Sequence, residues 1–302
     1  MRVLVYGSKG LIGSLACGLF RSTFQVVEGK SRIENQQDVH DELRAVSPMY
    51  VFCATGRTYY NGSSTIDGLE GRENLSVNLR DNLVGPMVLA KECHDFYVHL
   101  TIITTGCIYN SIYEGEFAVT QFTEQDPPNF FDSSYSIVKG HLNTLLQLYP
   151  NVLALRIRLP ILPMPHPRNS LTKLLNYPKI CSLENSITTS DLFERYLVKL
   201  MQAKVTGLLN FTNDYGIRHV DIMEMYREIV DPEHKYELVS REQLLSTLKA
   251  GRSNCVLDAT RLRSLFPDLP TAHESVRECL LKYKAAVHSG LKFRYRSLIK
   301  CR

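Results

Sequence analysis

The sequence lacks a long hydrophobic run, because no stretch of about 18 apolar residues occurs, and no transmembrane helix is expected. The first residues, MRVLVYGSKG, are typical of a buried strand and a glycine turn. They have no apolar helical region and no small-residue cleavage site, as a secretory signal would. Hydrophobic residues make up 44% and charged residues 22% of the 302, which is ordinary for a globular protein. We therefore expect a cytoplasmic chain with no membrane contact.

Paired cysteines are also missing. The eight cysteines are scattered and none forms a CxxC pair, so a disulfide framework and a metal site are both unsupported. The last stretch, HSGLKFRYRSLIKCR (288–302), lacks acidic residues, and removing its five basic residues lowers the formal net charge from +4 to −1. Those five are Lys292, Arg294, Arg296, Lys300 and Arg302. This tail could bind an anionic surface or simply be solvated or packed. The body is not basic, and no nucleic-acid partner is expected.

Predicted strands and helices alternate through the first half of the chain. Apolar runs predict strands over 2–6, 24–28, 49–55, 98–105 and 151–159. Helical spacing predicts helices over 11–22, 35–46, 74–96 and 133–149. Strands separated by helices indicate βαβ units, and hence an α/β fold with a Rossmann-type, doubly wound parallel sheet. Ligands of such sheets bind outside the carboxyl ends of the strands.

The pattern changes after residue 159. Four prolines between residues 160 and 167 predict a loop that leaves the sheet. Shorter elements follow, over 208–213, 219–229 and 274–286 among others. We predict a dinucleotide-binding domain over 1–160 and a smaller, mainly substrate-binding lobe over 161–302, with segments near 187–211 returning to the sheet.

A glycine pattern follows the first strand. In YGSKGLIG, Gly7, Gly10 and Gly13 have GxxGxxG spacing, and Leu11 and Ile12 open the helix. Glycines permit a tight turn and close backbone approach, and a helix N-terminus favours a pyrophosphate. The strand before and the helix after favour a dinucleotide site over a merely structural turn.

The residues after the second strand bear on the choice of cofactor. Glu28 could bind the ribose 2′-hydroxyl of NADH, whereas Lys30, Ser31 and Arg32 suit the 2′-phosphate of NADPH. We favour NADPH, with NADH as the alternative.

Tyr135 and Lys139 lie four residues apart in SSYSIVKG, at the start of a predicted helix, so they share one face. A tyrosine can exchange a proton with a carbonyl or alkoxide oxygen during hydride transfer, and its ordinary pKa of about 10 is too high for this at neutral pH. A neighbouring ammonium is expected to lower that pKa. The alternative is an ordinary surface pair.

GxxGxxG, "TTG" after the fourth strand and YxxxK together resemble the extended short-chain dehydrogenase/reductase family. In that family a Ser or Thr near the tyrosine hydrogen-bonds the substrate oxygen. The resemblance assigns this role to Thr105, with Thr104 as the alternative.

The likeness extends from Gly7 to about Asp258 and excludes the tail. It rests on GCIY, PNFFDSSYSIVKG, LRIRLPI, PRNSLTK, NFTN and GRSNCVLD. In this order they are similar to the bifunctional nucleotide-sugar 3,5-epimerase/4-reductases that make UDP-L-rhamnose or dTDP-L-rhamnose. The resemblance implies that Cys107 and Lys173 are the acid and base of epimerisation, without saying which is which. Without it, Cys107 would be a small buried apolar residue and Lys173 a solvated lysine.

Other roles are open at this point. Arg168, Asn169 and Arg252 lie in the matching motifs and could pair with the substrate diphosphate, or form ordinary ion pairs. Asn78 and Asn82 could touch the cofactor loop or be solvated. A monofunctional 4-ketosugar reductase and a non-catalytic NADP-binding regulatory subunit are the alternative functions. A homodimer is possible, and the uracil or thymine base stays undetermined.

Overall fold

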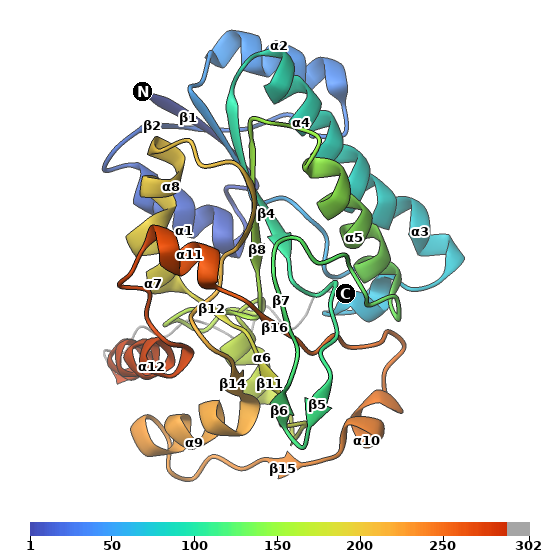
Figure 1. Ribbon diagram of the computed structural model, residues 1–302, viewed down its shortest axis with the longest axis vertical. Coiled ribbons are helices and arrows are strands. Elements are labelled where there is room, and N and C mark those ends of the chain that lie inside the picture. The colour runs from blue at the N-terminus through green and yellow to red at the C-terminus, as the bar shows by residue number, and fades with distance from the viewer. Residues whose placement is uncertain (289–302) are drawn as a thin grey trace.

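A six-stranded sheet lies at the centre of the computed structural model, which describes residues 1–288 (Figure 1). All its strands run parallel, in the order β13-β8-β4-β3-β1-β2. They are β1 (Arg2–Tyr6), β2 (Gln25–Glu28), β3 (Tyr50–Cys53), β4 (His99–Thr105), β8 (Val152–Ile157) and β13 (Gly207–Asn210). The prediction of a doubly wound α/β fold is confirmed. The five basic residues of the tail lie outside the described residues.

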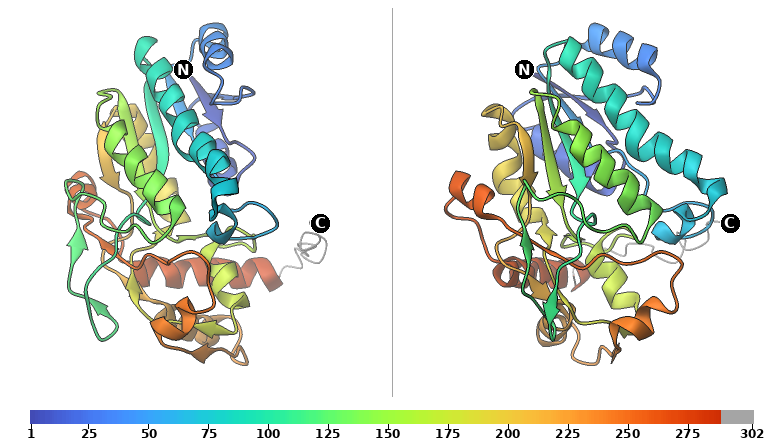
Figure 2. Two further views of the ribbon diagram at one scale, coloured as in Figure 1. Left: turned by 90° about the vertical axis from the view of Figure 1, so that its right-hand side faces the viewer. Right: turned by 45° about the vertical axis from the view of Figure 1, so that its right-hand side comes forward.

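Helices cover both faces of the sheet (Figures 1 and 2). One layer contains α1 (Leu11–Phe20), α7 (Ser190–Leu192), the π-helical η3 (Phe193–Leu197), α8 (Val198–Gln202) and α11 (Thr260–Leu265); the other contains α2 (Gln36–Val46), α3 (Arg72–Leu79), α4 (Gly85–Asp95) and α5 (Ser134–Leu146). Alternate residues of β1 enter the two cores. Val3 and Val5 pack with Phe20 of α1, whereas Leu4 packs with Val39 of α2. Burial on both faces explains why the strands are apolar throughout.

The helix predicted over 74–96 contains a widened turn. Between α3 and α4 lies the π-helical segment η2 (Arg80–Val84), and the N–H of Gly85 donates to the carbonyl of Arg80. Pro86 is the next residue and lies in the first turn of α4. Proline has no N–H, and its ring clashes with the carbonyl four residues earlier in a regular helix. The wider turn relieves both problems without ending the helix.

The rest of the chain forms a second lobe of short elements beneath the sheet (Figure 2). Its small sheets pair β5 (Tyr113–Glu114) with β6 (Phe117–Ala118), β7 (Gln121–Phe122) with β16 (Val256–Leu257), β9 (Pro160–Ile161) with β12 (Thr188–Thr189), β10 (Lys179–Ile180) with β15 (Glu237–Leu238), and β11 (Glu184–Asn185) with β14 (Ile217–Arg218). Its helices are α6 (Ser170–Asn176), α9 (His219–Ile229), α10 (Arg241–Leu245) and α12 (Ala272–His288); the 3-10 turn η1 (Ile66–Leu69) precedes α3. After β12 the chain returns through α7 and α8 to β13, at one edge of the main sheet.

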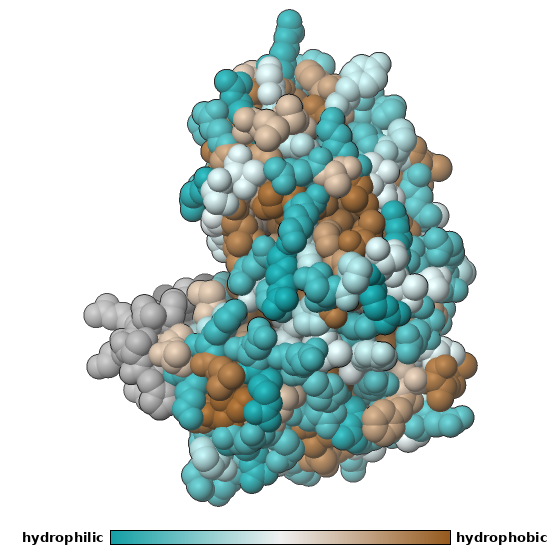
Figure 3. Space-filling model, turned by 60° about the vertical axis from the view of Figure 1, so that its left-hand side comes forward, coloured by the Kyte–Doolittle hydropathy of each residue, from teal (hydrophilic) through white to brown (hydrophobic). Residues whose placement is uncertain are grey.

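The surface in Figure 3 is mostly hydrophilic, with hydrophobic residues gathered in separate areas. Within residues 1–288, no helix combines the length and the apolar character that a membrane crossing needs. The same residues contain no group of three or more His, Cys, Asp or Glu side chains placed to hold a metal ion.

Candidate active site

The glycine loop follows β1 at the point where the strand order reverses. β2 lies on one side of β1 and β3 on the other, and ligands of such sheets bind in the crevice at this position. Gly7 has a φ of +81°, and a Cβ there would lie 2.8 Å from the carbonyl carbon of Ala54, just after β3. A Cβ at Gly13 would lie 2.0 Å from the carbonyl oxygen of Gly7. Both glycines are therefore required by close backbone packing.

The first turn of α1 has the features of an anion site. No side chain caps it at Gly10, and no acidic residue lies in the turn. The first N–H groups of a helix have no partner within the helix. Those of Leu11, Ile12 and Gly13 therefore face the crevice side of the loop with partial positive charge, which suits a pyrophosphate. The loop expected to hold a dinucleotide fits that ligand.

The residues predicted to select the cofactor are only partly available. Glu28 accepts a hydrogen bond from the Ser8 hydroxyl at 2.7 Å, so it lies against the glycine loop. The Ser31 hydroxyl donates to the Asp38 carbonyl and is not free to donate to a phosphate. Arg32 pairs with Glu34 through Nε, but its side chain is 69% exposed. Arg32 is thus better placed than Ser31 to bind a 2′-phosphate.

Thr105 and Cys107 meet Tyr135 where β4 ends. The backbone N–H of Cys107 donates to Oγ1 of Thr105 at 3.0 Å, and Tyr135, from the first turn of α5, is hydrogen-bonded with Thr105. Ser136 Oγ donates to the carbonyl of Cys107 at 2.6 Å and fixes the thiol segment against α5. Thr104, the alternative to Thr105, is buried, and its hydroxyl has no hydrogen-bond partner in the described part of the chain. Successive strand residues face opposite sides, so only Thr105 meets the tyrosine.

The pKa of Tyr135 is shifted in the direction opposite to our expectation. Burial raises it most and the neighbouring Cys107 raises it further, while Thr105 and Arg158 act in the other direction with less effect. The expected lowering by Lys139 was wrong, because desolvation of the phenolate dominates. Burial also lowers the pKa of Lys139 to about 8. Tyr135 therefore stays protonated at neutral pH, as a hydrogen-bond and proton donor.

Arg158 also belongs to this cluster, although no sequence motif predicted a role for it. It follows β8 directly and is 3% exposed. Its Nη1 donates to Sγ of Cys107 at 2.7 Å. The signal available in the sequence was LRIRLPI, in which a second arginine interrupts an apolar strand.

Lys173 approaches the same cluster from α6. Burial lowers its pKa, the positive charges of Arg168 and Arg252 lower it further, and Cys107 raises it. Among residues 1–288 its ammonium has no hydrogen-bond or ion-pair partner. A lysine whose ammonium is destabilised by burial and by like charges is suited to proton transfer near neutral pH.

Arg168 and Asn169 have different surroundings, although they are neighbours. The Arg168 guanidinium lies over the Tyr59 ring, 4.6 Å from its centroid, and a Cβ added at Gly10 would lie 3.7 Å from its Nη1. Arg168 thus reaches the glycine loop. Asn169 is fully buried. Its oxygen accepts from Leu162 and Leu171 and its nitrogen donates to two carbonyls, so it caps α6. The expected contact of Asn169 with a diphosphate was wrong, because no donor or acceptor is left.

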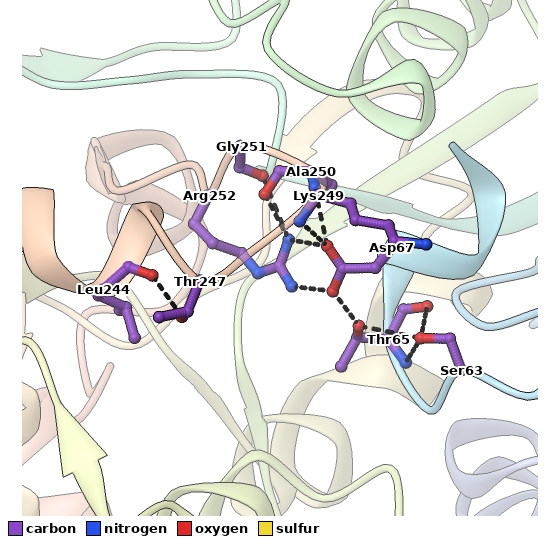
Figure 4. Close-up of polar contacts among 9 residues, drawn as sticks. All are labelled: Ser63, Thr65, Asp67, Leu244, Thr247, Lys249, Ala250, Gly251 and Arg252. Carbon is purple, nitrogen blue, oxygen red and sulfur yellow. Dashed lines mark hydrogen bonds and ion pairs between the residues drawn. The ribbon is translucent and has the colours of Figure 1, made fainter. Parts of the chain in front are cut away.

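Arg252 pairs with Asp67 and joins two loops that are distant in sequence (Figure 4). The Asp67 carboxylate also accepts from the Thr65 hydroxyl and from the backbone N–H groups of Lys249 and Ala250. Burial raises the pKa of Asp67, but these hydrogen bonds and the charge of Arg252 outweigh it and hold the pKa well below its usual range. The ion-pair alternative predicted for Arg252 is therefore present.

Asn78 and Asn82 are fully buried rather than solvated. Asn82 accepts from the N–H of Arg57 and donates to its carbonyl, and Asn78 donates to Ser134 at the start of α5. The helix that carries them therefore fixes the loop after β3 and the segment that holds Tyr135.

No family profile matches the chain, but close relatives exist. The protein L780 of Acanthamoeba polyphaga mimivirus is 41% identical over 288 residues, covering 94% of this chain and 99% of the relative. The crystal structure of that L780 UDP-rhamnose synthase superposes with a TM-score of 0.89 over 93% of this chain and 99% of the other, at 40% identity.

Two further proteins are similar. The bifunctional dTDP-4-dehydrorhamnose 3,5-epimerase/dTDP-4-dehydrorhamnose reductase of Arabidopsis thaliana is 33% identical over 285 residues, covering 93% of this chain and 91% of the relative. A dTDP-4-dehydrorhamnose reductase from Clostridium acetobutylicum superposes with a TM-score of 0.78 at 17% identity, covering 95% of this chain and all of the other. That last likeness concerns the fold alone.

Proposed function

Because the chain belongs to the family of the bifunctional dTDP-4-dehydrorhamnose 3,5-epimerase/reductases and the L780 UDP-rhamnose synthase, we propose that it makes an NDP-L-rhamnose. The substrate is UDP-4-keto-6-deoxy-D-glucose or its dTDP form, and NADPH is the reductant. One observation carries the proposal: a thiol, a phenol and a destabilised ammonium, from Cys107, Tyr135 and Lys173, gather beside a glycine loop suited to a dinucleotide.

Epimerisation at C3 and C5 needs two groups that can exchange protons with the sugar. The C4 ketone makes the hydrogens on both neighbouring carbons acidic. Inversion removes a proton from one face and returns one to the other, so an acid and a base must flank the ring. Cys107 and Lys173 come from different elements, and the charge of Cys107 raises the pKa of Lys173. This arrangement supports their assignment as that pair.

The intermediate of each inversion is an enolate with negative charge on the C4 oxygen. Tyr135 is held protonated by burial, and Thr105 lies beside it. Their hydroxyl groups can donate hydrogen bonds to this oxygen as charge develops, which lowers the barrier to proton removal. The same donors serve the ketone before and after each inversion.

Reduction completes the sequence at the same carbon. Bound NADPH would supply the hydride to C4. Tyr135 then donates its proton to the oxygen, and Lys139, one helical turn further along α5, offers positive charge to the phenolate left behind. Arg168, which lies against the glycine loop, is proposed to contact the cofactor pyrophosphate rather than the substrate diphosphate. Arg252, whose guanidinium pairs with Asp67, is proposed to face the substrate diphosphate.

The test is a reaction in D2O with purified protein, UDP-4-keto-6-deoxyglucose and NADPH, with the product identified by NMR. We expect UDP-L-rhamnose with deuterium at C3 and C5. A 6-deoxyhexose with the original configuration and no deuterium would leave a monofunctional reductase and remove the roles of Cys107 and Lys173. No NADPH oxidation with the UDP or dTDP substrate would favour the regulatory alternative.

Homodimer formation and a cytoplasmic location are part of the proposal. Three large hydrophobic side chains on or just after α5 are exposed, Ile137, Leu145 and Leu148, and a second copy could cover them. Analytical ultracentrifugation should find the mass of two chains, and cell fractionation should find the protein with cytoplasmic markers. A single species at the mass of one chain would contradict the dimer.

A further inference from the structure

Arg158 is a buried cation without a carboxylate partner among the residues that the structure describes. Apart from Cys107, it donates to oxygens of Asn185 and Ser253, both neutral. Its Nε is buried and has no hydrogen-bond partner within residues 1–288. Burying an unpaired charge is costly, so a cation in this position requires a compensating anion.

Arg156, two residues earlier, is a second buried arginine with which Arg158 can be compared. It is as deeply buried, but its guanidinium donates to oxygens of Thr123, Glu124 and Asn143 and lies over an aromatic ring. Burial lowers the pKa of Arg156. Burial acts in the same direction on Arg158, but the charge of Cys107 and other neighbours raises its pKa on balance. Both guanidinium groups donate to neutral oxygens, but the carboxylates of Glu124 and Asp126 also act on Arg156, whereas Arg158 contacts the sulfur of Cys107.

The groups around Arg158 leave one candidate for the anion. The titratable side chains that face the pair from neighbouring elements are Tyr113, Tyr135, Lys173, His219 and Cys255. None is a carboxylate. Burial raises the pKa of both tyrosines and of Cys255, which keeps them neutral, and burial lowers the pKa of His219, which keeps it neutral too. Among the described residues around Arg158, Cys107 is the remaining group that can carry a negative charge.

We propose that Arg158 is a positioning residue that holds Cys107 as the thiolate and directs its sulfur into the site. The inference rests on the proposed function, since a thiolate is the form that can remove a proton from the sugar. On accepting that proton Cys107 becomes a thiol, the electron pair of the C–H bond passes into the enolate, and exchange with solvent restores the thiolate. The short contact between Nη1 and Sγ fixes the rotamer of the thiol side chain.

Alkylation of Cys107 tests the pair without any substrate. Iodoacetamide reacts with thiolates, so the rate at Cys107, followed by mass spectrometry from pH 5 to 10, gives the pH at which half of the thiol has ionised. Cys181, which is also partly exposed, is the reference in the same sample. In the unmodified protein we expect Cys107 to ionise at lower pH than Cys181. The opposite order would overturn the proposal.

Substitutions of the two arginines then test whether Arg158 sets the pH at which Cys107 ionises. Arg158→Gln should move the Cys107 midpoint upward by about one to three pH units, the usual influence of an adjacent opposite charge. Arg158→Lys keeps the positive charge but loses the planar guanidinium with its several N–H donors. The Cys107 midpoint of this variant should lie between those of the unmodified protein and Arg158→Gln. Arg156→Lys is the matched control and should leave the midpoint unchanged. An unchanged midpoint in Arg158→Gln would overturn the proposal, and if that variant does not fold, an unchanged midpoint in Arg158→Lys has the same meaning.

Turnover separates this inference from the proposed function. With 4-keto sugar in D2O, Arg158→Lys should slow deuterium entry more than it slows reduction of a substrate that is already epimerised. Equal slowing of both steps would indicate a merely structural role. A shifted alkylation midpoint together with no reaction of the unmodified protein would leave the pair intact and refute the proposed function.

Discussion

Replacing Gly13 by alanine tests whether the glycine loop is built for a cofactor. A Cβ at this position would lie 2.0 Å from the carbonyl oxygen and 2.6 Å from the carbonyl carbon of Gly7. Both are backbone atoms, so no side-chain rotation can relieve the clash. The loop must move away from α1, and the N–H groups that face a pyrophosphate move relative to the carboxyl end of β1.

The size of the effect follows from this clash. Overpacking costs about 1–3 kcal/mol, and a backbone clash belongs at the upper end of that range. Better helix propensity of alanine recovers at most about 1 kcal/mol. With a shift of about 2 °C for each kcal/mol in a chain of this size, the melting temperature should fall by about 4 °C. NADPH should bind at least about tenfold more weakly, which corresponds to about 1.4 kcal/mol.

Gly18→Ala is the matched control, because Gly18 lies in the same helix and a Cβ there meets nothing within 4 Å. It should stabilise the protein by about 0.5–1 kcal/mol through helix propensity and leave cofactor binding unchanged. Calorimetry gives the melting temperatures, and the change in NADPH fluorescence on binding gives Kd. A Gly13→Ala protein that binds NADPH as tightly as Gly18→Ala does would refute the reasoning.

Further predictions concern ionisation. Burial lowers the pKa of Lys139 to about 8, so activity that needs its ammonium should fall as pH rises through about 8, and Lys139→Arg should move this limb of the kcat profile upward. If the alkaline fall in kcat occurs at the same pH in Lys139→Arg, Lys139 is not the group that causes it. The depressed pKa of Asp67 gives stability that is present above its unfolded pKa of about 3.9 and is lost as pH falls below it. Asp67→Asn should therefore flatten the acid side of a plot of melting temperature against pH. Cys107→Ala should retain reduction of a substrate that is already epimerised while losing deuterium exchange at C3 and C5, and retained exchange would contradict its role.

The local pattern of the chain was sufficient to predict the main sheet. Strands such as Tyr50–Cys53 are buried on both faces, so their residues are apolar without interruption and are recognisable without knowledge of their partners. The short lobe elements were not predictable in this way. A two-residue strand such as β11 is defined by its partner β14, more than thirty residues later, and no local periodicity marks it.

The part of the candidate site that was predicted from the sequence is the part that lies in recognisable motifs. Thr105, Cys107 and Tyr135 were predicted and lie together. The sign of the tyrosine pKa shift was not predictable, because it depends on how much water the fold removes. The ligand-binding role predicted for Asn169 was wrong. The sequence alone does not distinguish an asparagine that faces a ligand from one that caps a helix. Arg158 was missed because its partner Cys107 lies on another strand connection, 51 residues away.

The widened turn η2 makes the length of its helix as important as its composition. Each residue of a regular helix advances the chain by about 100°. Deleting one residue between Arg80 and Val84 would allow regular hydrogen bonding, but it would rotate everything after it by about that angle relative to α3. Asn78 would then keep its place while Leu89 and Cys93, which are fully buried in α4, would turn out of the core. We therefore expect this helix to accept substitutions at its solvent-facing positions and to reject single-residue deletions.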